Sequence, residues 1–553
     1  MTGSETVSWE AKSQKYREAA AAKIPEAWRL PREMTTGLGP TSNRGVLDIP
    51  RKCGILTERE LDLTEHYDVV SLVEMLSNGT VSSLEVTTAF CKRAAIAQQL
   101  TCCLTETLFD EALERAKYCD EYLASKKKVL GPFHGLPVSV KDSFNIKGIQ
   151  ATIGFISFLD HPLASENAAL VNILLDQGAV LYVKTNIPQT LMTADSENNL
   201  FGRCLNPQKL SLTSGGSSGG EGALLAMRGS PFGVGTDIAG SIRIPAYCNG
   251  TFGLRPTARR IPYSGQASGA RAGTFGILPA AGPLARSVRD IEYFMKSILS
   301  YDVWTVDEAV ISVPWRDIAA QPKANNLKLG FLTEDPARPL HPPVLRTFQD
   351  ALTKLQDAGH TVVDLAPHLP ADILSQVVKT SWTMFGMDPT KTGLSHLKAS
   401  GERIVDSIPT ARLPELDDWK PSLDDVYRTN VERLQIGRLF RQAFVKNELD
   451  AVVTPVFQTS APPHDSFGVP YYTILANFLD MPAISLPYGN ADKAQDAEFK
   501  REVKYIPPYD PDAVEGAICG IQIMGRPMKD EELVGYAQTV TDVLGAKMVE
   551  IPG

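Results

Sequence analysis

Short apolar runs bounded by glycine or proline alternate along this chain with longer segments whose apolar residues recur at helical spacing. The runs are too short for helices and fit buried strands. They are LPVSV (136–140), AVLYVK (179–184), AVVTPVF (451–457) and AISLPY (483–488). Because sheets whose strands alternate with helices are covered by those helices, the pattern predicts an α/β protein with a mostly buried sheet.

Two of the intervening segments show the helical pattern most clearly. The segment SSLEVTTAFCKRAAIAQQL opens with Ser82 and Glu85 at capping-box spacing. The segment VLRTFQDALTKLQDAG puts Leu345 and Phe348 on one face and ends at Gly359. We expect a helix over each segment.

Composition narrows the class of protein. The chain has 553 residues and a formal net charge of −9 without a basic stripe, so nucleic acid is not an expected partner. The eight cysteines are scattered and none stands in a CxxC pair, which favours reduced thiols over a metal finger. The first residues are polar, and no run approaches the ~18 apolar residues of a membrane span. We therefore expect a cytoplasmic protein with no membrane span.

The stretch LTSGGSSGGEGALLAM (212–227) gathers glycines and serines before a run of small and apolar residues. A flexible linker is one interpretation, but the flanking segments are not of low complexity. A phosphate-binding loop is another, but Glu221 follows Gly220 where a P-loop carries lysine, and its carboxylate would repel phosphate. A third is the G-x-S-x-G nucleophile elbow on Ser217; the polar residues before it argue against the strand that an elbow requires.

Two further stretches accompany this one in a fixed order. Lys141 lies in HGLPVSVKD, Ser217 in GGSSGGEGAL and Ser241 in GTDIAGSIRIPA. Together these motifs resemble the amidase signature family of serine hydrolases. The resemblance extends over nearly the whole chain through VKTNIPQTLM, GTFGLRPT, LDAVVTP, NFLDMPAISLP and GIQIMGRPMKDEELV, and the early GVLDIPRKCGIL and AFCKRAAIAQQLT resemble fungal acetamidases.

The resemblance implies an organisation for the chain. Residues 1–55 are expected to form a helical N-terminal arm, and 56–553 a single large α/β domain whose mixed sheet is covered by helices on both faces. Within that domain, about 130–290 would hold the catalytic core, and about 300–450 a variable segment on the substrate side.

The resemblance also implies a mechanism that the residues can support. Ser241 would attack the amide carbonyl and carry the acyl group. Ser217, which the family holds through a cis peptide bond, would relay the proton, and Lys141 would be the base. A free lysine has a pKa near ~10.4 and cannot act as a base at neutral pH. Burial at the end of an apolar strand would lower the pKa of Lys141, because desolvation disfavours the ammonium form.

Other residues receive roles from the same resemblance. The backbone N–H groups of Ile238, Ala239, Gly240 and Ser241 would bind the oxyanion. Ala239 stands where the commonest family pattern has glycine; its N–H is retained, and only a requirement for positive φ would put the position in doubt.

The remaining assignments concern the surroundings of the nucleophile. Asp237 and Arg243 are expected to pair and hold the nucleophile loop, and Ser218 to hydrogen-bond the relay serine. Leu191 and Met192 match a substrate-lining stretch, although a hydrophobic core role suits them equally well. No histidine, aspartate or glutamate cluster has metal-ligand spacing, so no metal or other cofactor is implied.

The expected function is the hydrolysis of small or aromatic carboxamides to carboxylate and ammonia or amine. One alternative is a histidine-dependent esterase that uses Ser217 as nucleophile. Another is a non-catalytic or amidotransferase-type subunit, which the acidic balance of the chain disfavours because such a subunit works on tRNA. The expected partner is a small amide, and homodimerisation is left open.

Overall fold

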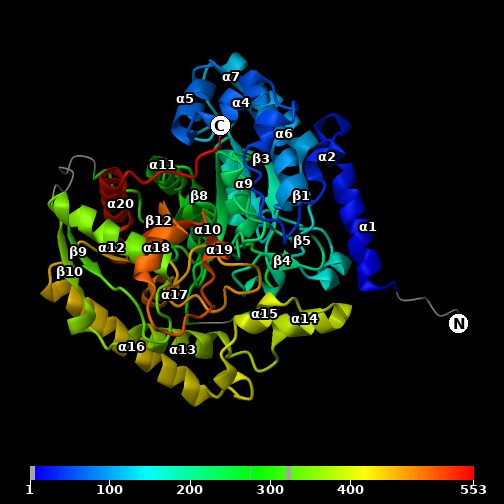
Figure 1. Cartoon of the computed structure of the whole chain (residues 1–553). Coiled ribbons are helices and arrows are strands. Elements are labelled where there is room, and N and C mark those ends of the chain that lie inside the picture. The colour runs from blue at the N-terminus through cyan, green and yellow to red at the C-terminus, as the bar shows by residue number, and fades with distance from the viewer. Residues whose placement is uncertain (1–6, 274–275, 319–325, 553) are drawn as a thin grey trace, which may run out of the picture.

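The computed structural model describes residues 7–273, 276–318 and 326–552. Within them, eleven strands form one sheet that crosses the centre of the molecule (Figure 1). In spatial order the strands are β1 (Leu104–Thr107), β3 (Val180–Thr185), β2 (Pro137–Lys141), β6 (Phe232–Asp237), β8 (Ala280–Ala285), β7 (Phe252–Arg255), β12 (Ala483–Asn490), β13 (Ile518–Met524), β11 (Ala451–Pro455), β9 (Lys328–Phe331) and β10 (Thr361–Asp364). A separate small pair joins β4 (Glu197–Asn198) to β5 (Gly202–Arg203).

The sheet is mixed, as expected. β2 pairs in parallel with both β3 and β6, and β9 pairs in parallel with β10 and β11. From β6 across the sheet to β11, each strand pairs antiparallel with the next. The four apolar runs of the sequence coincide with β2, β3, β11 and β12, of which the first three are fully buried.

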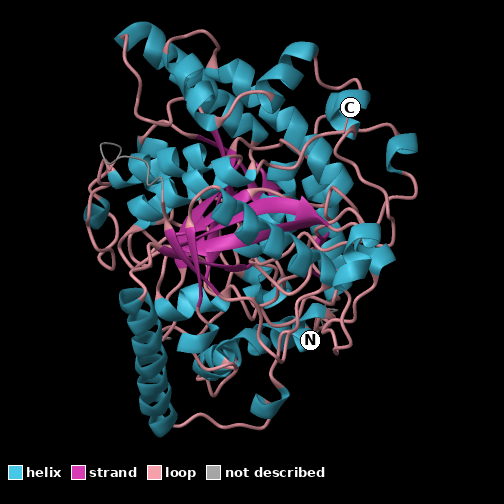
Figure 2. Ribbon diagram, turned by 60° about the vertical axis from the view of Figure 1, so that its left-hand side comes forward, coloured by secondary structure: helices cyan, strands magenta, loops and turns pink. Residues whose placement is uncertain are grey.

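Helices surround this sheet (Figure 2). They are α1 (Trp9–Ala22), α2 (Arg32–Thr35), α3 (Ile49–Lys52), α4 (Glu58–Glu65), α5 (Val69–Ser77), α6 (Ser83–Thr101), α7 (Phe109–Lys126), α8 (Ala169–Asp176), α9 (Gly219–Ala226), α10 (Arg243–Asn249), α11 (Val288–Leu299), α12 (Pro342–Asp357), α13 (Ile373–Phe385), α14 (Thr392–Ser400), α15 (Ser407–Thr410), α16 (Leu423–Lys446), α17 (Ile474–Leu479), α18 (Lys493–Asp496), α19 (Pro511–Val514) and α20 (Asp530–Leu544).

The helices cover both faces of the sheet. On one face α9 packs on β2, β3, β6 and β8, and its neighbour α10 packs on β7, β12 and β13. On the other face α11, α12 and α20 contact one another and the strands from β8 to β13. A single large α/β domain with a buried mixed sheet results, as the sequence predicts.

The two helices predicted from periodicity form with small differences. Ser82 caps α6 by accepting a hydrogen bond from the amide of Glu85 at 3.0 Å. The reciprocal half of a capping box is missing, because the Glu85 carboxylate accepts from Arg59 instead. α12 begins two residues earlier than the pattern indicates, with prolines in its first turn, and Gly359 follows its end at φ +91°.

The N-terminal segment is helical and lies against the domain. In α1 the Ser13 hydroxyl is buried and donates to the carbonyl of Asn199, and Tyr16 donates to the carboxylate of Glu106. α2 and α3 follow as single turns. The arm therefore has its own buried contacts with the rest of the chain.

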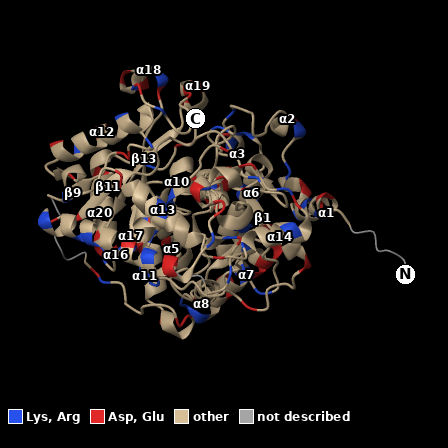
Figure 3. Cartoon of the chain, turned by 90° about the horizontal axis from the view of Figure 1, so that it is seen from below, with Lys and Arg blue, Asp and Glu red and all other residues tan. Residues whose placement is uncertain are grey.

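Charged residues of both signs are interspersed over the molecule (Figure 3). No helix in the described part of the chain combines the length and the apolar character that crossing a bilayer requires.

Candidate active site

Lys141 ends strand β2, and its side chain is fully buried. Its Nζ donates to Ser217 Oγ at 2.6 Å and to Thr236 Oγ1 at 2.9 Å. Thr236 lies on β6, the parallel neighbour of β2, so two adjacent strands fix the position of the amine. The sequence motif gave Lys141 and Ser217 but not Thr236.

The environment of Lys141 favours the neutral form of its amine. Burial removes water from the ammonium form and lowers the pKa of Lys141 to about 7, while the carboxyl groups of Asp237 and Glu221 act in the opposite direction when they are ionised. A lysine whose pKa is lowered this far can be unprotonated at neutral pH.

Ser217 follows a cis peptide bond between Gly216 and Ser217. The backbone here has no room for larger residues. Gly215 has φ +77°, and a Cβ on Gly216 would lie 2.6 Å from the carbonyl oxygen of Thr193. The glycines therefore shape the loop so that the Ser217 hydroxyl faces Lys141, and α9 begins directly after it.

Ser241 lies in the turn between β6 and α10 and retains 8% exposure. Its carbonyl accepts a hydrogen bond from the amide of Ser218 at 3.2 Å, which ties the two serine loops together. The strand–turn–helix arrangement that a nucleophile elbow requires thus surrounds Ser241. Within the described residues no strand leads directly into Ser217, as the polar residues before it indicate.

The turn before Ser241 presents backbone amides. Among the residues that the structure describes, the N–H groups of Ile238, Ala239 and Ser241 have no recorded acceptor, whereas the Gly240 N–H donates to Asp237 Oδ1 at 2.8 Å. Gly240 has φ +124°, whereas Ala239 does not have a positive φ. The alanine is therefore compatible with the turn, and the amide of Gly240 holds the loop rather than pointing to a free site.

A buried ion pair supports this turn. Arg243 Nε and Nη2 each donate to the Asp237 carboxylate at 3.1 Å. Arg243 also donates to Gln522 on β13 and to Asn477 on α17, each at 2.7 Å. Burial opposes ionisation of Asp237, but the charge and hydrogen bonds of Arg243 and the amide of Asn477 lower its pKa to about 2.

The remaining predicted residues differ in how close they come to these groups. The Ser218 hydroxyl is buried and has no hydrogen-bond partner among the described residues, so the expected bond to Ser217 is not formed and only the Ser218 amide reaches the nucleophile loop. Leu191 packs beside Phe155 and Leu397 in a small apolar cluster. Met192 is 42% exposed, and the next residue, Thr193, lies against Gly216.

Two residues that the sequence reasoning did not assign complete the surroundings. Glu221 is buried within hydrogen-bond distance of the Ser139 and Thr185 hydroxyls, and burial raises its pKa to about 7. Thr473 donates to the carbonyl of Ala239 at 2.7 Å. Glu221 could have been found from the sequence, because it is a single carboxylate among the small residues of the glycine-rich stretch. Nothing in the sequence connects Thr473 to Ala239.

The histidines have partners elsewhere. His134 accepts from the amide of Leu130, and His341 and His464 contact the backbone carbonyls of Pro507 and Leu210. In the described part of the chain no histidine hydrogen-bonds to Ser217 or Ser241, and no three histidine, cysteine, aspartate or glutamate side chains gather as metal ligands.

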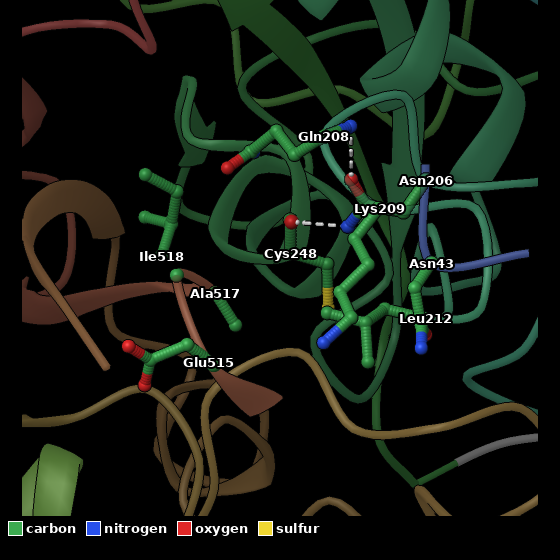
Figure 4. A pocket seen from close by; sticks show the side chains of 10 residues that line it. Asn43, Asn206, Gln208, Lys209, Leu212, Cys248, Glu515, Ala517 and Ile518 are labelled. Atoms are coloured by element: carbon green, nitrogen blue, oxygen red, sulfur yellow. Dashed lines mark hydrogen bonds between the residues drawn. The ribbon is translucent and has the colours of Figure 1, made fainter. Parts of the chain in front are cut away.

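A pocket of about 240 Å³ lies apart from the serines (Figure 4). Asn206, Leu212 and Cys248 line it from the segments that precede Ser217 and follow Ser241, and Glu515 and Ile518 close it from the C-terminal part. Lys141, Ser217 and Ser241 are not among its lining residues, so this pocket is distinct from the lysine–serine site.

The family model described as Amidase matches residues 85–534. The chain belongs to the amidase signature family. It is 39% identical over 98% of its length to a protein named Amidase from Gibberella moniliformis, of which 99% is covered. It is also 36% identical over 97% of its length to Acetamidase of Emericella nidulans, of which 98% is covered.

The solved structures agree with these relatives. A structure named Fatty acid amide hydrolase superposes with a TM-score of 0.89 at 31% identity, covering 98% of this chain and 96% of that one. The predicted family, the single-domain α/β fold and the enzyme class are therefore confirmed: the protein is an amidase.

Proposed function

We propose that this amidase cleaves the C–N bond of a small non-peptide carboxamide through an acyl-enzyme on Ser241, with Ser217 relaying protons to and from Lys141. The observation that carries the proposal is the 2.6 Å contact between the buried Lys141 amine and the Ser217 hydroxyl. The amide link between Ser218 and the Ser241 carbonyl adds support, because it keeps the relay loop beside the loop of the nucleophile.

The proposed steps balance protons. Ser241 Oγ attacks the carbonyl carbon and gives its proton to Ser217 Oγ, whose own proton passes to Lys141 Nζ. The oxyanion accepts hydrogen bonds from amides of the turn whose N–H groups are free among the described residues, those of Ile238, Ala239 and Ser241. The Lys141 ammonium returns the proton through Ser217 to the leaving nitrogen, the C–N bond breaks, and a water molecule hydrolyses the acyl-enzyme by the same route.

The substrate class rests on two kinds of support. Relatives carry the name acetamidase, which favours amides of small acids. The oxyanion turn shares its apolar cluster with Met384 and the partly buried Trp382 and Phe385, side chains that suit a larger apolar acyl group. A panel of primary amides from acetamide to aryl and long-chain amides, assayed with the pure protein, distinguishes the two.

The test of the mechanism is the identity of the labelled serine. A fluorophosphonate should modify Ser241, as found by peptide mass spectrometry, and Ser241→Ala should abolish both labelling and turnover while Ser218→Ala retains them. Label on Ser217 would favour the esterase alternative instead. Turnover of a simple amide by the purified chain, without ATP or a second protein, would exclude a non-catalytic or amidotransferase-type subunit.

A further inference from the structure

The outward face of α16 carries a row of exposed apolar side chains. The helix lies at the edge of the molecule (Figures 1 and 2), and its inner face buries Ile436, Phe440 and Phe444. The outward residues are Leu423, Tyr427, Val431, Leu434 and Val445, with exposed fractions of 68, 65, 52, 73 and 65%. Single exposed apolar residues are ordinary, but a row along one helix face marks an interaction surface.

The row is arranged symmetrically about Leu434. Leu423 and Val445 stand eleven residues before and after it, and Tyr427 and Arg441 stand seven before and after it. Residues at these separations share one helix face. A second α16 packed antiparallel would therefore bring Leu434 against its own copy and Leu423 against Val445. It would also lay the Tyr427 ring on the Arg441 guanidinium, a favourable cation–π arrangement.

The charges along α16 are divided unevenly between its two halves. The first half carries carboxylates at Asp424, Asp425 and Glu432, of which the last two are partly buried and pair with Arg428, and a further cation, Arg433, lies in the same half. The second half carries Arg438, Arg441 and Lys446. An antiparallel pair sets each acidic half over a basic half, which is the self-complementarity that a two-fold interface needs.

We propose that α16 is the contact surface of a homodimer, in which two copies of the chain pack this helix antiparallel about a two-fold axis at Leu434. The inner face of α16 belongs to the same apolar cluster as Ala239 of the oxyanion turn. The dimer contact would thus buttress the layer behind that turn without supplying any group to the reaction.

The oligomeric state and one cross-link test this proposal. Light scattering after gel filtration should give twice the chain mass for the native protein and the single chain mass for Leu434→Arg, with the circular dichroism spectrum unchanged. Under mild oxidation Leu434→Cys should form a covalent dimer, because residues at a two-fold axis approach their own copies. Lys126→Cys on α7, at the far end of the molecule, should not.

Three results would overturn the proposal. They are a native protein of single chain mass at micromolar concentration, a Leu434→Arg variant that stays dimeric, and a monomer that sediments with anionic vesicles through α16. The last would assign the row to a lipid surface.

A different observation, the hydrogen bonding beneath Lys141, carries a second inference. Ser139 lies two residues before Lys141 on the same face of β2, and Thr185 is the register partner of Lys141 on β3. Both hydroxyls contact Glu221, at 2.6 Å to Oε2 and 2.9 Å to Oε1. The carboxyl fits only because residue 233 is glycine, since a Cβ there would lie 1.8 Å from Oε2.

The contacts around Glu221 require one more hydrogen than the hydroxyls supply. Ser139 Oγ lies within hydrogen-bond distance of both Glu221 Oε2 and Ser230 Oγ, at 2.6 and 3.0 Å, and Ser230 donates to the Phe232 carbonyl at 2.7 Å. With the contact between Thr185 and Glu221 there are four contacts, and the hydroxyls of Ser139, Ser230 and Thr185 supply three hydrogens for them. A proton on the carboxyl fills the fourth contact and lets Ser139 donate onward to Ser230.

We infer that Glu221 is a neutral carboxylic acid in the resting enzyme, and that this neutrality leaves Lys141 without a counter-charge beneath it. The other ionisable groups near Glu221 are Tyr182 on β3 and Cys103 before β1; Asp237, near Lys141, is already neutralised by Arg243. Glu221 is thus a positioning residue for Lys141, an inference that rests on the proposed role of that lysine.

Glu221→Gln is the matched test, because the amide of glutamine donates and accepts where a protonated carboxyl does. The variant should keep its unfolding midpoint and leave the acid limb of the kcat/KM pH profile in place. Infrared difference spectroscopy should show a protonated-carboxyl carbonyl band in the native protein that the variant lacks. The band needs no turnover, so it reports on Glu221 even if Lys141 proves not to be the base.

An ionised Glu221 would give the opposite results. Removing its negative charge would disfavour the ammonium form of Lys141 and move the acid limb to lower pH by about 1 unit or more. The protonated-carboxyl band would also be absent from the native protein. Either result overturns the inference.

Discussion

Lys141 Nζ lies 2.6 Å from Ser217 Oγ, and both side chains are closed off from solvent at the junction of β2 and the glycine-rich loop. The amine has no carboxylate in contact with it; its second partner is the hydroxyl of Thr236. A buried amine among hydroxyls is more stable in its neutral form, and from the proposed role of Lys141 we expect this property to govern the pH dependence of the enzyme.

The activity of the native enzyme should rise with pH through a midpoint near 7. The reaction needs the neutral amine, and protonation of Lys141 below its pKa of about 7 removes the base. Thr236→Val should move the midpoint to lower pH, because the lost oxygen accepts more strongly from the ammonium form. The measurement is kcat/KM between pH 5 and 10; a profile that is flat below pH 8 would contradict this role.

The adjacent serines should respond very differently to the same substitution. Ser217→Ala removes the group between Lys141 and the nucleophile, and we expect kcat to fall by about 10²-fold or more. Ser218→Ala removes a hydroxyl without a hydrogen-bond partner, and kcat should change by less than about 3-fold, in line with a neutral substitution. Steady-state kinetics on one amide, with equal unfolding midpoints, checks the contrast.

Arg243→Ala should destabilise the fold strongly. It leaves the Asp237 carboxylate buried without its partner, which costs about 3–5 kcal/mol. Arg412→Ala breaks an exposed pair with Asp417 and should cost less than about 1 kcal/mol. Urea unfolding followed by fluorescence gives both values. A loss near that of the exposed pair would show that Arg243 does not hold the turn.

The two small residues of the proposed oxyanion turn should not be interchangeable. Gly240→Ala puts a Cβ 2.2 Å from Thr473 Oγ1 at φ +124°, so the turn must shift and kcat should fall by about 10²-fold. Ala239→Gly keeps the N–H at a position without positive φ and should leave kcat nearly unchanged. Kinetics of both variants at matched stability would decide; equal effects would place the oxyanion elsewhere.

Met192 tests the predicted substrate-lining stretch. Because the side chain is 42% exposed, Met192→Ala should change stability by no more than about 0.5 kcal/mol. If the residue lines the acyl site, KM for amides with long apolar acyl groups should rise several-fold while KM for acetamide stays constant. An equal change in KM for both amides would show that Met192 does not line the acyl site.

The local elements were predictable because each has a signal within a few residues. The buried run 136–140 became β2, and the periodic segment ending at Gly359 became α12. The order of strands was not predictable, since β8 enters between β6 and β7, and β13 between β12 and β11, by pairings that no local pattern encodes.

The candidate site divides in the same way. Lys141, Ser217 and Ser241 stand in motifs, and Asp237 and Arg243 flank the nucleophile closely enough to suggest their pairing. The expected hydrogen bond of the Ser218 hydroxyl is not formed, and the Ser218 amide instead donates to the Ser241 carbonyl. Thr473, Asn477 and Gln522 support the turn from more than 230 residues away, a distance over which sequence proximity carries no information.

The contacts of Arg243 with residues near the C-terminal end of the sequence have a consequence for the synthesis of the enzyme. Its guanidinium is held by Asn477 and by Gln522, which lies on one of the last strands to leave the ribosome. The motifs that carry Lys141, Ser217 and Ser241 emerge in the first half of translation, but the turn around the nucleophile lacks its support until β13 has been made. A nascent chain, and any fragment released before that point, is therefore expected to be catalytically silent.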